Sequence, residues 1–381
     1  MKIRKPHKPI KSTALAIGVG VNLLVAMLTA FAAYGGAFDP DERVIASIAS
    51  MTLPLFLVGS LLLLVADLLI DKRQALIIVG GWIASLPPIL TFAPVNFGGG
   101  VPNDAEKDDT FTFLTYNVLH LWDFRGENPN METNATLDYI LNTDADIVNL
   151  QELEMLVPDK TWKVTREQID SIKARYPYRL IESGAKQLSL FSKYPFEKVD
   201  IDVPANVDYV MECYKLRING RNVHLLNVHL KSIGLTPEDK ELYKGTLKNI
   251  PDSKHELKRE LKEVKSQLLS KLAEAFRVRA VQARAVREVL DSIGGPFIVA
   301  GDFNDIPGCY AIRTISGQDM HDAYGETAFG PTITYHGDHF YFRIDHILYR
   351  GNFRAVDIER GKISSSDHNP LLTTFVFEPE K

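Results

Sequence analysis

Three long apolar stretches open the chain, and short apolar runs of strand length recur through the rest. No Asp, Glu, Lys or Arg occurs from Thr13 to Phe38, from Val44 to Ala66, or from Ala75 to Val95. Each stretch supplies the roughly 20 apolar residues that a membrane-spanning helix requires. A soluble domain seldom contains three such stretches in succession. We therefore expect residues 1–97 to form a membrane region with about three transmembrane helices.

Basic residues around these stretches predict their orientation. Lys and Arg precede the first stretch, Lys72 and Arg73 lie between the second and third, and the intervening first loop is acidic. By the positive-inside rule, the N-terminus and the Lys72–Arg73 loop are cytoplasmic. Three crossings predict an integral protein of the bacterial inner membrane, with the following domain in the periplasm or outside. If the first stretch were a cleaved signal peptide, two spans and the same final placement would result.

Residues 98–109 have the composition of a linker. Three glycines and a proline are followed by a short acidic stretch that ends at Asp109. Such a segment cannot support a core of its own. The chain has 381 residues and is 45% hydrophobic, so residues 110–381 are long enough for one large catalytic domain.

In residues 110–381, polar side chains flank the short apolar runs. The run before Asp302 is Phe297-Ile298-Val299-Ala300, and similar runs precede or follow the other polar positions. Open α/β sheets present ligand groups at strand ends, and hard metal ions prefer oxygen ligands. The pattern therefore predicts a metal and phosphate site. Its candidate residues are Asn117, Glu152, His229, Asp302, Asn304, Asp345, Asp367 and His368.

Each motif also has a structural interpretation when it is taken alone. The Gly301–Asp305 segment could be a simple turn, because Gly, Asp and Asn all favour turns. Glu152 could begin a helix, where a carboxylate suits the positive end of the dipole. His229 could be a structural histidine at a strand end. The joint occurrence of six such elements in one order favours the catalytic interpretation over all of these.

In this order the motifs resemble the endonuclease/exonuclease/phosphatase superfamily of DNase I-like metal-dependent phosphoesterases, over about residues 110–378. The resemblance implies a DNase I-like four-layer α/β sandwich of two mainly antiparallel sheets flanked by helices. It also implies a Mg²⁺ cofactor, with Mn²⁺ as a substitute. The metal ligands would be Asn117, Glu152 and Asp367.

The resemblance further implies roles for the remaining candidates. Asp302 and Asn304 would orient or deprotonate the attacking water, and His229 would supply a second cationic or hydrogen-bonding contact. His368, steered by Asp345, would contact a phosphoryl oxygen. A carboxylate beside an imidazole favours the charged form of the imidazole and fixes its orientation.

The net charge of the predicted catalytic domain and one departure from the motifs of related enzymes bear on the expected substrate. The first 100 residues contain 8 of the 43 Lys and Arg residues and 5 of the 48 Asp and Glu residues. The remaining residues therefore carry 35 basic and 43 acidic side chains, a net charge of −8. This gives a nuclease no support, because nucleic-acid binding draws on basic surfaces. Some apurinic endonucleases carry an acidic residue two positions after the strand-end Asn, where this chain has Leu119. Membrane anchoring favours lipid headgroups or small phosphate esters, with an anchored nuclease or a non-catalytic binding module as alternatives.

Two further features leave alternatives open. From about His255 to Leu290, apolar residues recur at spacings of three and four, which predicts an amphipathic helix. We expect its second half, from Val278, to be a helix packed on the sheet with surface ion pairs. The basic segment before it, including the loop 235–251, is either structural or serves as a lid, a lipid-surface contact or a partner-binding arm. Cys213 and Cys309 could pair outside the cytoplasm, but the default is two unpaired core residues.

Overall fold

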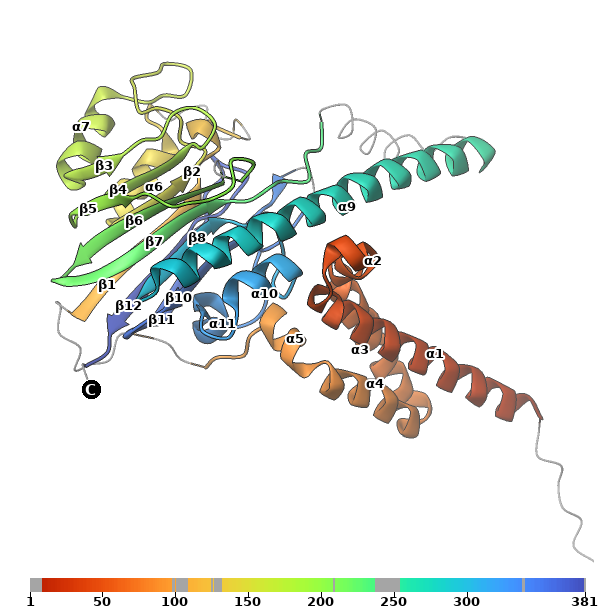
Figure 1. Ribbon diagram of the computed structural model, residues 1–381. Coiled ribbons are helices and arrows are strands. Elements are labelled where there is room, and N and C mark those ends of the chain that lie inside the picture. Colours follow the sequence, from red (N-terminus) through yellow and green to blue (C-terminus); the bar gives the residue numbers. More distant parts are fainter. Residues whose placement is uncertain are drawn as a thin grey trace, which may run out of the picture. The chain divides into compact units, whose positions relative to one another are not determined.

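The computed structural model describes residues 9–97, 100, 109–124, 126, 132–207, 210–236, 254–337 and 340–379. The chain divides into two compact units, which are considered separately (Figure 1). One is helical and comprises Met1–Thr91 with Gly308–Tyr310. The other is an α/β unit and comprises Phe92–Pro307 with Ala311–Lys381.

The helical unit contains five α-helices in its described residues. They are α1 (Pro9–Tyr34), α2 (Pro40–Ser50), α3 (Leu53–Ile70), α4 (Lys72–Ala84) and α5 (Leu86–Phe92), with a short 3-10 turn η1 (Gly35–Ala37) after α1. Two segments of these residues are long and apolar enough to cross a membrane, Leu15–Ala37 and Leu53–Ile70. Helices α4 and α5 meet at a 70° bend and would make a third span if the bent pair crosses as one.

The second apolar stretch does not form one continuous helix as expected from Val44 to Ala66. Helix α2 ends at Ser50 and α3 begins at Leu53, with a proline in the first turn of α3. Proline is favoured at that position because its missing N–H would be unpaired there anyway. The candidate span is therefore shifted toward the C-terminus, to Leu53–Ile70.

A buried polar contact joins three helices of this unit. The side-chain amide of Asn22 in α1 donates to Asp67 Oδ2 of α3 at 2.7 Å and to Gln74 Oε1 of α4 at 3.3 Å. All three side chains are buried. Hydrogen bonds between polar side chains stabilise helix association in an apolar environment. This contact therefore helps to fix the register of α1, α3 and α4.

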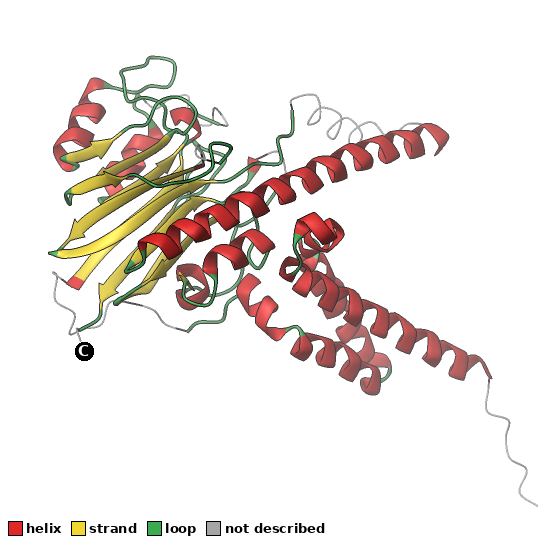
Figure 2. Cartoon of the chain, in the orientation of Figure 1, coloured by secondary structure: helices red, strands yellow, loops and turns green. Residues whose placement is uncertain are grey.

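The α/β unit is built on two six-stranded sheets (Figure 2). The first has the order β11-β12-β1-β2-β4-β3, and the second β5-β6-β7-β8-β10-β9. The strands of the first sheet are β1 (Thr110–Asn117), β2 (Ile147–Gln151), β3 (Tyr178–Leu180), β4 (Leu188–Ser192), β11 (Phe353–Arg360) and β12 (Leu371–Phe377). Those of the second are β5 (Phe196–Val199), β6 (Met211–Ile218), β7 (Arg221–His229), β8 (Phe297–Asp302), β9 (His321–Asp322) and β10 (Asp345–Arg350). The helices are η3 (Leu119–Leu121), α6 (Ala135–Thr143), α7 (Arg166–Arg175), α9 (Lys254–Ile293), α10 (Tyr310–Ser316) and α11 (Ala323–Thr327).

Two apolar cores hold these layers together. One lies between the sheets and combines residues of the first sheet, such as Phe113 and Phe375, with residues of the second, such as Leu225 and Ile298. The other lies between the first sheet and helices α6 and α7. Alternate side chains of a strand point to opposite faces, so each sheet can serve a core on either side. The observed layers confirm the predicted DNase I-like α/β sandwich.

Most neighbouring strands are antiparallel, as expected. Two central pairs, β1 with β2 and β7 with β8, are parallel. Parallel neighbours end at the same edge of a sheet, whereas antiparallel neighbours present their opposite ends there. The ends of these four strands, together with the beginnings of β10 and β12, therefore form one edge of the sandwich.

Helix α9 covers the predicted amphipathic segment and extends over 40 residues. The prediction of surface ion pairs on its second half was wrong at Arg279, which is 2% exposed and ion-paired to the buried Asp305. Gln282 of the same helix accepts a hydrogen bond from the backbone of Lys231, just after β7. Most of the loop 235–251, for which a lid or lipid-contact role was left open, lies outside the described residues. The described part of α9 is thus attached to the loops that follow β7 and β8.

Neither Cys213 nor Cys309 forms a disulfide, and both are buried. Burial, followed by the charge of Glu212, raises the pKa of the Cys213 thiol to about 12. A thiol with so high a pKa is a poor nucleophile. Cys213 thus acts as a small core side chain in strand β6.

Candidate active site

The strand ends bring five of the predicted residues together at one edge of the sandwich. Asn117 ends β1, and its parallel neighbour β2 ends one residue before Glu152. In the other sheet, His229 ends β7 opposite Asp302 at the end of β8, and Asp302 faces Asp345 at the beginning of β10. Two pairs of parallel strands from different sheets therefore place their carboxyl ends together, as the sequence pattern indicated.

Asn117 connects the two sheets through its side-chain amide. The amide donates to Glu152 Oε1 at 3.0 Å and to Asp302 Oδ2 at 3.1 Å. Asn117 is 1% exposed, so its orientation is fixed by its neighbours. The contact brings a carboxylate from each sheet to one amide group.

Two of the predicted site residues have left-handed backbone conformations. Glu152 has φ 59° and Asn304 has φ 51°. Asn adopts this conformation readily, but Glu does so at a cost of roughly 1–3 kcal/mol, which the surrounding fold must offset. Backbone bonds from Val118 N to Gln151 O and from His120 N to Glu152 O hold this turn in place. The strained position aims the Glu152 carboxylate toward Asn117.

Asp302 is the most crowded group of the site. Its Oδ1 accepts a hydrogen bond from the backbone N–H of Asn304 at 2.8 Å. Its Oδ2 lies 3.6 Å from His229 Nε2 and 3.6 Å from His368 Nε2. The Asn304 side chain turns away from Asp302 and donates to the carbonyl of Leu230 at 3.0 Å. Asp302 is therefore flanked by an amide and two imidazoles.

A glycine permits the close approach of β7 and β8 beside this carboxylate. Gly301 has φ 143°, and a Cβ atom there would clash with the carbonyl oxygen of Val228. Only glycine tolerates this backbone without strain. The Gly-Asp sequence is thus required by strand packing as well as by the chemistry of Asp302.

Asp345 and His368 form a buried pair. Asp345 Oδ2 lies 2.9 Å from His368 Nδ1, and both side chains are less than 5% exposed. The ring of Tyr335 packs edge-on against the imidazole, with centroids 5.0 Å apart. The bond to Nδ1 fixes the ring so that Nε2 faces Asp302. The expected pairing of His368 with Asp345 is thus present, and it holds the imidazole in one orientation.

Burial and charge set the protonation of this pair. Burial opposes the charged imidazolium, but the carboxylates of Asp345 and Asp302 outweigh it and raise the pKa of His368 to about 10. Burial and the charge of Asp345 raise the pKa of Asp302 to about 6, against the opposing effects of His368 and His229. At pH 7 to 8 His368 is therefore cationic, while Asp302 is mostly ionised and basic enough to accept a proton.

Asp367 lies at the same edge, directly before His368 in the chain. Its carbonyl oxygen accepts a hydrogen bond from His336 N at 2.9 Å. Burial raises the pKa of its carboxyl group, and the charges of Glu152 and Asp345 raise it further, whereas His368 lowers it. Its Oδ1 is buried and has no hydrogen-bond donor among the described residues.

The carboxylates of this edge fit a divalent cation. Four of them, from Glu152, Asp302, Asp345 and Asp367, gather around imidazoles and one amide, and both Asp345 Oδ1 and Asp367 Oδ1 are buried without a donor in the described part of the chain. Ligand atoms of Asp302, Asp345 and His368 lie within 4.8 Å of one another. Oxygen-rich, negatively charged sites of this kind bind Mg²⁺ or Mn²⁺.

Several contributors to this edge were absent from the sequence prediction. His120 Nε2 lies 3.7 Å from Glu152 Oε2, and its ring packs on Trp122. Ser366 Oγ donates to the carbonyl of Asn117 at 2.8 Å and accepts from His368 N at 3.1 Å. Ser366 directly precedes Asp367 and His368, two of the predicted residues, so its position in the sequence already pointed to the site. No sequence pattern pointed to His120, because its position at the site depends on a left-handed turn at residues 119–121.

Beneath Asp302, a buried histidine supports the loop of Asp305. His346 Nε2 donates to the carbonyl of Asp305 at 2.9 Å, and its ring packs edge-on against Phe303 with centroids 5.3 Å apart. Burial, with the positive charge of Arg343 adding to it, lowers the pKa of His346 to about 4. The folded protein therefore keeps this imidazole neutral.

This depressed pKa predicts an acid-dependent loss of stability. The stabilisation is present above the unfolded pKa near 6.5 and is lost as the pH falls toward 4, because the unfolded state then binds a proton that the folded state resists. Between pH 7.5 and 4.5 His346 should account for about 2–3 kcal/mol of the loss. Thermal denaturation of His346→Phe should show a correspondingly smaller change over this interval than the native chain does. Equal pH dependence in both proteins would refute this assignment.

Comparison with known proteins identifies the family of the α/β unit. Residues 114–368 match the Endonuclease/Exonuclease/phosphatase family, which covers more than half of the chain. The chain belongs to this family. Its members are phosphoesterases or nucleases that generally depend on divalent metals, as the sequence motifs predicted. Residues 14–92 match a domain family of unknown function, and no curated protein sequence matches significantly.

Several solved structures are similar to this endonuclease/exonuclease/phosphatase protein at low sequence identity. An endonuclease/exonuclease/phosphatase from Bacteroides vulgatus is 19% identical, with a TM-score of 0.44 over 71% of this chain and 99% of its own. Truncated Caenorhabditis elegans TDP2 is also 19% identical, with a TM-score of 0.42 over 70% of this chain and 98% of its own. ANGEL2, a 2′,3′-cyclic phosphatase, is 15% identical, with a TM-score of 0.42 over 74% of this chain and all of its own.

Proposed function

We propose that this protein is a membrane-anchored, Mg²⁺-dependent phosphoesterase that hydrolyses phosphodiester or phosphomonoester bonds in lipid headgroups or small phosphate esters. The observation that carries the proposal is the continuous set of contacts from Glu152 through Asn117 and Asp302 to His368 and Asp345. It combines an oxygen-rich cation site, a basic carboxylate and a fixed imidazolium within one edge of the fold.

Each part of this arrangement meets a requirement of phosphate-ester hydrolysis. Glu152, Asn117 and Asp367 would hold Mg²⁺, which neutralises phosphate charge and lowers the pKa of water. Asp302, placed by Asn304 N–H, orients the attacking water and accepts its proton. His368 and His229 flank Asp302 and would donate hydrogen bonds to phosphoryl oxygens as negative charge develops there.

Exposed apolar side chains near the start of the α/β unit support work at a lipid surface. Asn96 donates from its side chain to the carbonyls of Gly325 and Ala328, and so fixes Val95 and Phe97 to the end of α11. Phe97 and Phe329 pack together, yet they are 83% and 64% exposed. This patch begins only three residues after α5 ends at Phe92. An apolar patch at that short distance from an apolar helix suits contact with the bilayer interface.

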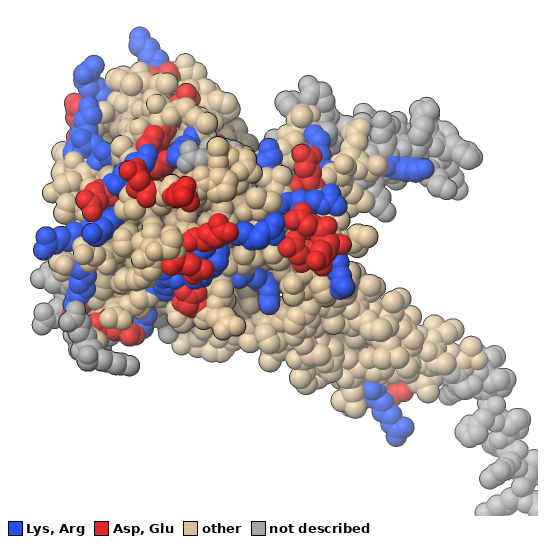
Figure 3. All heavy atoms as spheres, in the orientation of Figure 1, with Lys and Arg blue, Asp and Glu red and all other residues tan. Residues whose placement is uncertain are grey.

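An anchored nuclease is the second candidate, and one observation favours it. Trp122 stacks on Trp162 with centroids 5.4 Å apart and also contacts His120, which adjoins Glu152. Trp122 is 44% exposed, and exposed aromatic rings stack on nucleobases. Against this, Lys and Arg are interspersed with Asp and Glu on the face drawn in Figure 3, where they form no continuous basic track.

Substrate and metal requirements can be tested on the full chain in detergent or nanodiscs. Metal-stripped protein should release no product from phospholipid, nucleotide, sugar-phosphate or oligonucleotide substrates, and Mg²⁺ or Mn²⁺ should restore hydrolysis of at least one. Preference for lipid over oligonucleotide would support the first candidate, and the reverse the nuclease. If no member of the panel is hydrolysed with any divalent metal, a non-catalytic binding module becomes the better interpretation.

We further propose that the α/β unit faces the periplasm or exterior. By the positive-inside rule, the basic residues favour a cytoplasmic N-terminus and a cytoplasmic Lys72–Arg73 loop. The side on which the α/β unit lies then depends on whether the bent α4–α5 pair crosses the membrane. Alkaline phosphatase fused after Lys381 should be active, because it folds only after export, whereas green fluorescent protein fused there should be dark. The opposite pattern would make the bent pair re-entrant and the α/β unit cytoplasmic.

A further inference from the structure

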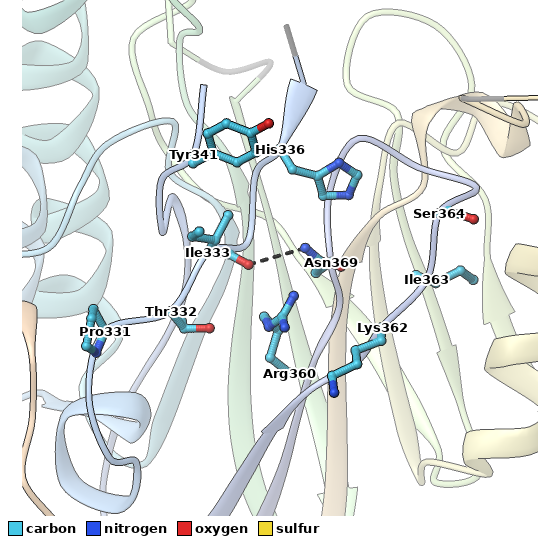
Figure 4. Close-up of a pocket in the computed structure, with 10 residues that line it drawn as sticks. All are labelled: Pro331, Thr332, Ile333, His336, Tyr341, Arg360, Lys362, Ile363, Ser364 and Asn369. Atoms are coloured by element: carbon cyan, nitrogen blue, oxygen red, sulfur yellow. Dashed lines mark hydrogen bonds between the residues drawn. The ribbon is translucent and has the colours of Figure 1, made fainter. Parts of the chain in front are cut away.

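A second polar pocket lies beside the candidate active site. It has a volume of about 600 Å³, within the range of small-molecule sites. One wall comes from the segment between α11 and β10, and the other from the end of β11 and the loop that leads to β12. The lining residues are Pro331, Thr332, Ile333, His336, Tyr341, Arg360, Lys362, Ile363, Ser364 and Asn369 (Figure 4).

The pocket shares its walls with the catalytic edge. Asn369 lines the pocket and directly follows His368, and the backbone N–H of His336 bonds to the carbonyl of Asp367. Asn369 also joins the two walls, because its side chain donates to the carbonyl of Ile333 at 3.2 Å and its backbone N–H to that of Thr334. A group held in the pocket would therefore belong to a molecule that can also reach His368.

The charge of the pocket is opposite to that of the catalytic edge. Among the described residues, its lining contains Arg360 and Lys362 but no carboxylate. Neither cation forms an ion pair or a side-chain hydrogen bond within the described residues, although Arg360 is half-buried. Other half-buried or buried arginines of this unit are paired, as Arg343 is with Asp322 and Arg350 with Asp319. Both unpaired cations reach into the same pocket in Figure 4.

We propose that this pocket binds a second anionic group of the substrate, a phosphate or carboxylate other than the ester that is hydrolysed. The guanidinium of Arg360 can donate two parallel hydrogen bonds to such a group, and the Lys362 ammonium adds a mobile positive charge. Ile333 and Tyr341, which are 39% and 54% exposed, supply an apolar rim for the carbon skeleton that links the two groups. The assignment of the ligand as substrate rests on the proposed phosphoesterase function.

Binding to the metal-stripped full chain separates this pocket from the catalytic edge. Without metal, the four carboxylates of that edge repel anions, whereas Arg360 and Lys362 retain their charge. Titration calorimetry with glycerol 3-phosphate should give millimolar or tighter binding that weakens with added salt. Arg360→Gln and Lys362→Gln should each weaken binding by about 10-fold or more, since a hydrogen bond to a charged group contributes about 1.5–3 kcal/mol.

Arg354→Gln is the matched control. Arg354 is an exposed cation of the same strand, β11, and does not line the pocket. This variant should bind glycerol 3-phosphate as the native chain does, and thermal denaturation should show all three variants folded. Equal binding by the native chain and an Arg360→Gln/Lys362→Gln double variant, or no binding by the native chain, would overturn the proposal. Neither result depends on hydrolysis. Failure of the anion-binding proposal can therefore be distinguished from failure of the proposed phosphoesterase function.

The same titration identifies the source of the anion. In phosphatidylcholine nanodiscs that also contain phosphatidic acid, a lipid headgroup in the pocket should weaken the binding of glycerol 3-phosphate relative to phosphatidylcholine alone. Unchanged binding indicates a soluble phosphate ester. Both results support an anion in the pocket, provided that Arg360→Gln weakens the binding of glycerol 3-phosphate as stated above.

Discussion

Asp302→Asn should reduce the rate of phosphate-ester hydrolysis by about 10²–10³, with little change in substrate binding. The substitution preserves the shape of the side chain but removes the proton acceptor that lies between Asn304 N–H and the two imidazoles. Loss of one preorganised catalytic contact typically costs about 2.7–4 kcal/mol in the transition state. Initial-rate measurements at saturating substrate and metal would check this value.

The same substitution should leave the metal-free protein at least as stable as before. The pKa of Asp302 is raised to about 6, above its unfolded value, so its contribution to stability is present at low pH and is lost as the pH rises through 6. A neutral Asn avoids this loss, which amounts to about 3 kcal/mol at most. The melting temperature of Asp302→Asn relative to the native chain should therefore be higher at pH 8 than at pH 4.

Glu182→Gln provides a control for this pair of measurements. Glu182 is a partly exposed acid that pairs with Lys198, away from the catalytic residues. Its replacement should change neither the rate nor the pH dependence of melting by much, because surface ion pairs contribute about 0–1 kcal/mol. If Asp302→Asn behaved like Glu182→Gln, Asp302 would not be the proton acceptor.

The sequence was sufficient to predict the edge at which the site forms. Apolar runs end next to Asn117, Glu152, His229 and Asp302, and the ends of parallel strands lie at the same edge of a sheet. The local sequence was therefore enough to predict both the strands and the polar groups at their ends. The order of these groups along the chain resembled a known superfamily, and that resemblance supplied the pairing of the strands into two sheets.

Contacts between distant segments could not be predicted in this way. Arg279 resembled the other basic residues of an amphipathic helix, and only the folded chain shows that it is buried against Asp305. Arg360 and Lys362 lie at the end of a strand and gained significance only from the wall that residues 331–341 place opposite them. The break between α2 and α3 was missed for another reason, since no charged residue occurs on either side of it from Val44 to Ala66.

Arg279 connects the long helix α9 to the catalytic loop. Its Nε donates to Asp305 Oδ2 at 3.1 Å, and one terminal nitrogen donates to the carbonyl of Lys231 at 2.9 Å. Its guanidinium also lies over the ring of Phe276, 4.7 Å from the centroid. Asp305 in turn accepts from Ile306 N, and its carbonyl accepts from His346. One buried cation therefore supports the loops after both His229 and Asp302.

Arg279→Met should lower the stability of the α/β unit by about 3–5 kcal/mol. Methionine can fill much of the space, but the Asp305 carboxylate would then be buried without its cation, which is the costly way to break a buried ion pair. For a unit of this size the melting temperature should fall by about 10 °C. Hydrolysis should also decline below that temperature, because the loop that positions Asp302 and Asn304 loses its support.

Two further variants determine whether the effect comes from the buried charge. Arg277→Met changes an exposed arginine of the same helix and should shift the melting temperature by no more than a degree or two, roughly 0.5 kcal/mol. Adding Asp305→Asn to Arg279→Met removes the unpaired charge and should recover part of the lost stability. If Arg279→Met and Arg277→Met proved equally mild, the buried pair would not anchor α9. If the double variant were no more stable than Arg279→Met, the loss would instead arise from packing and from the bond to Lys231.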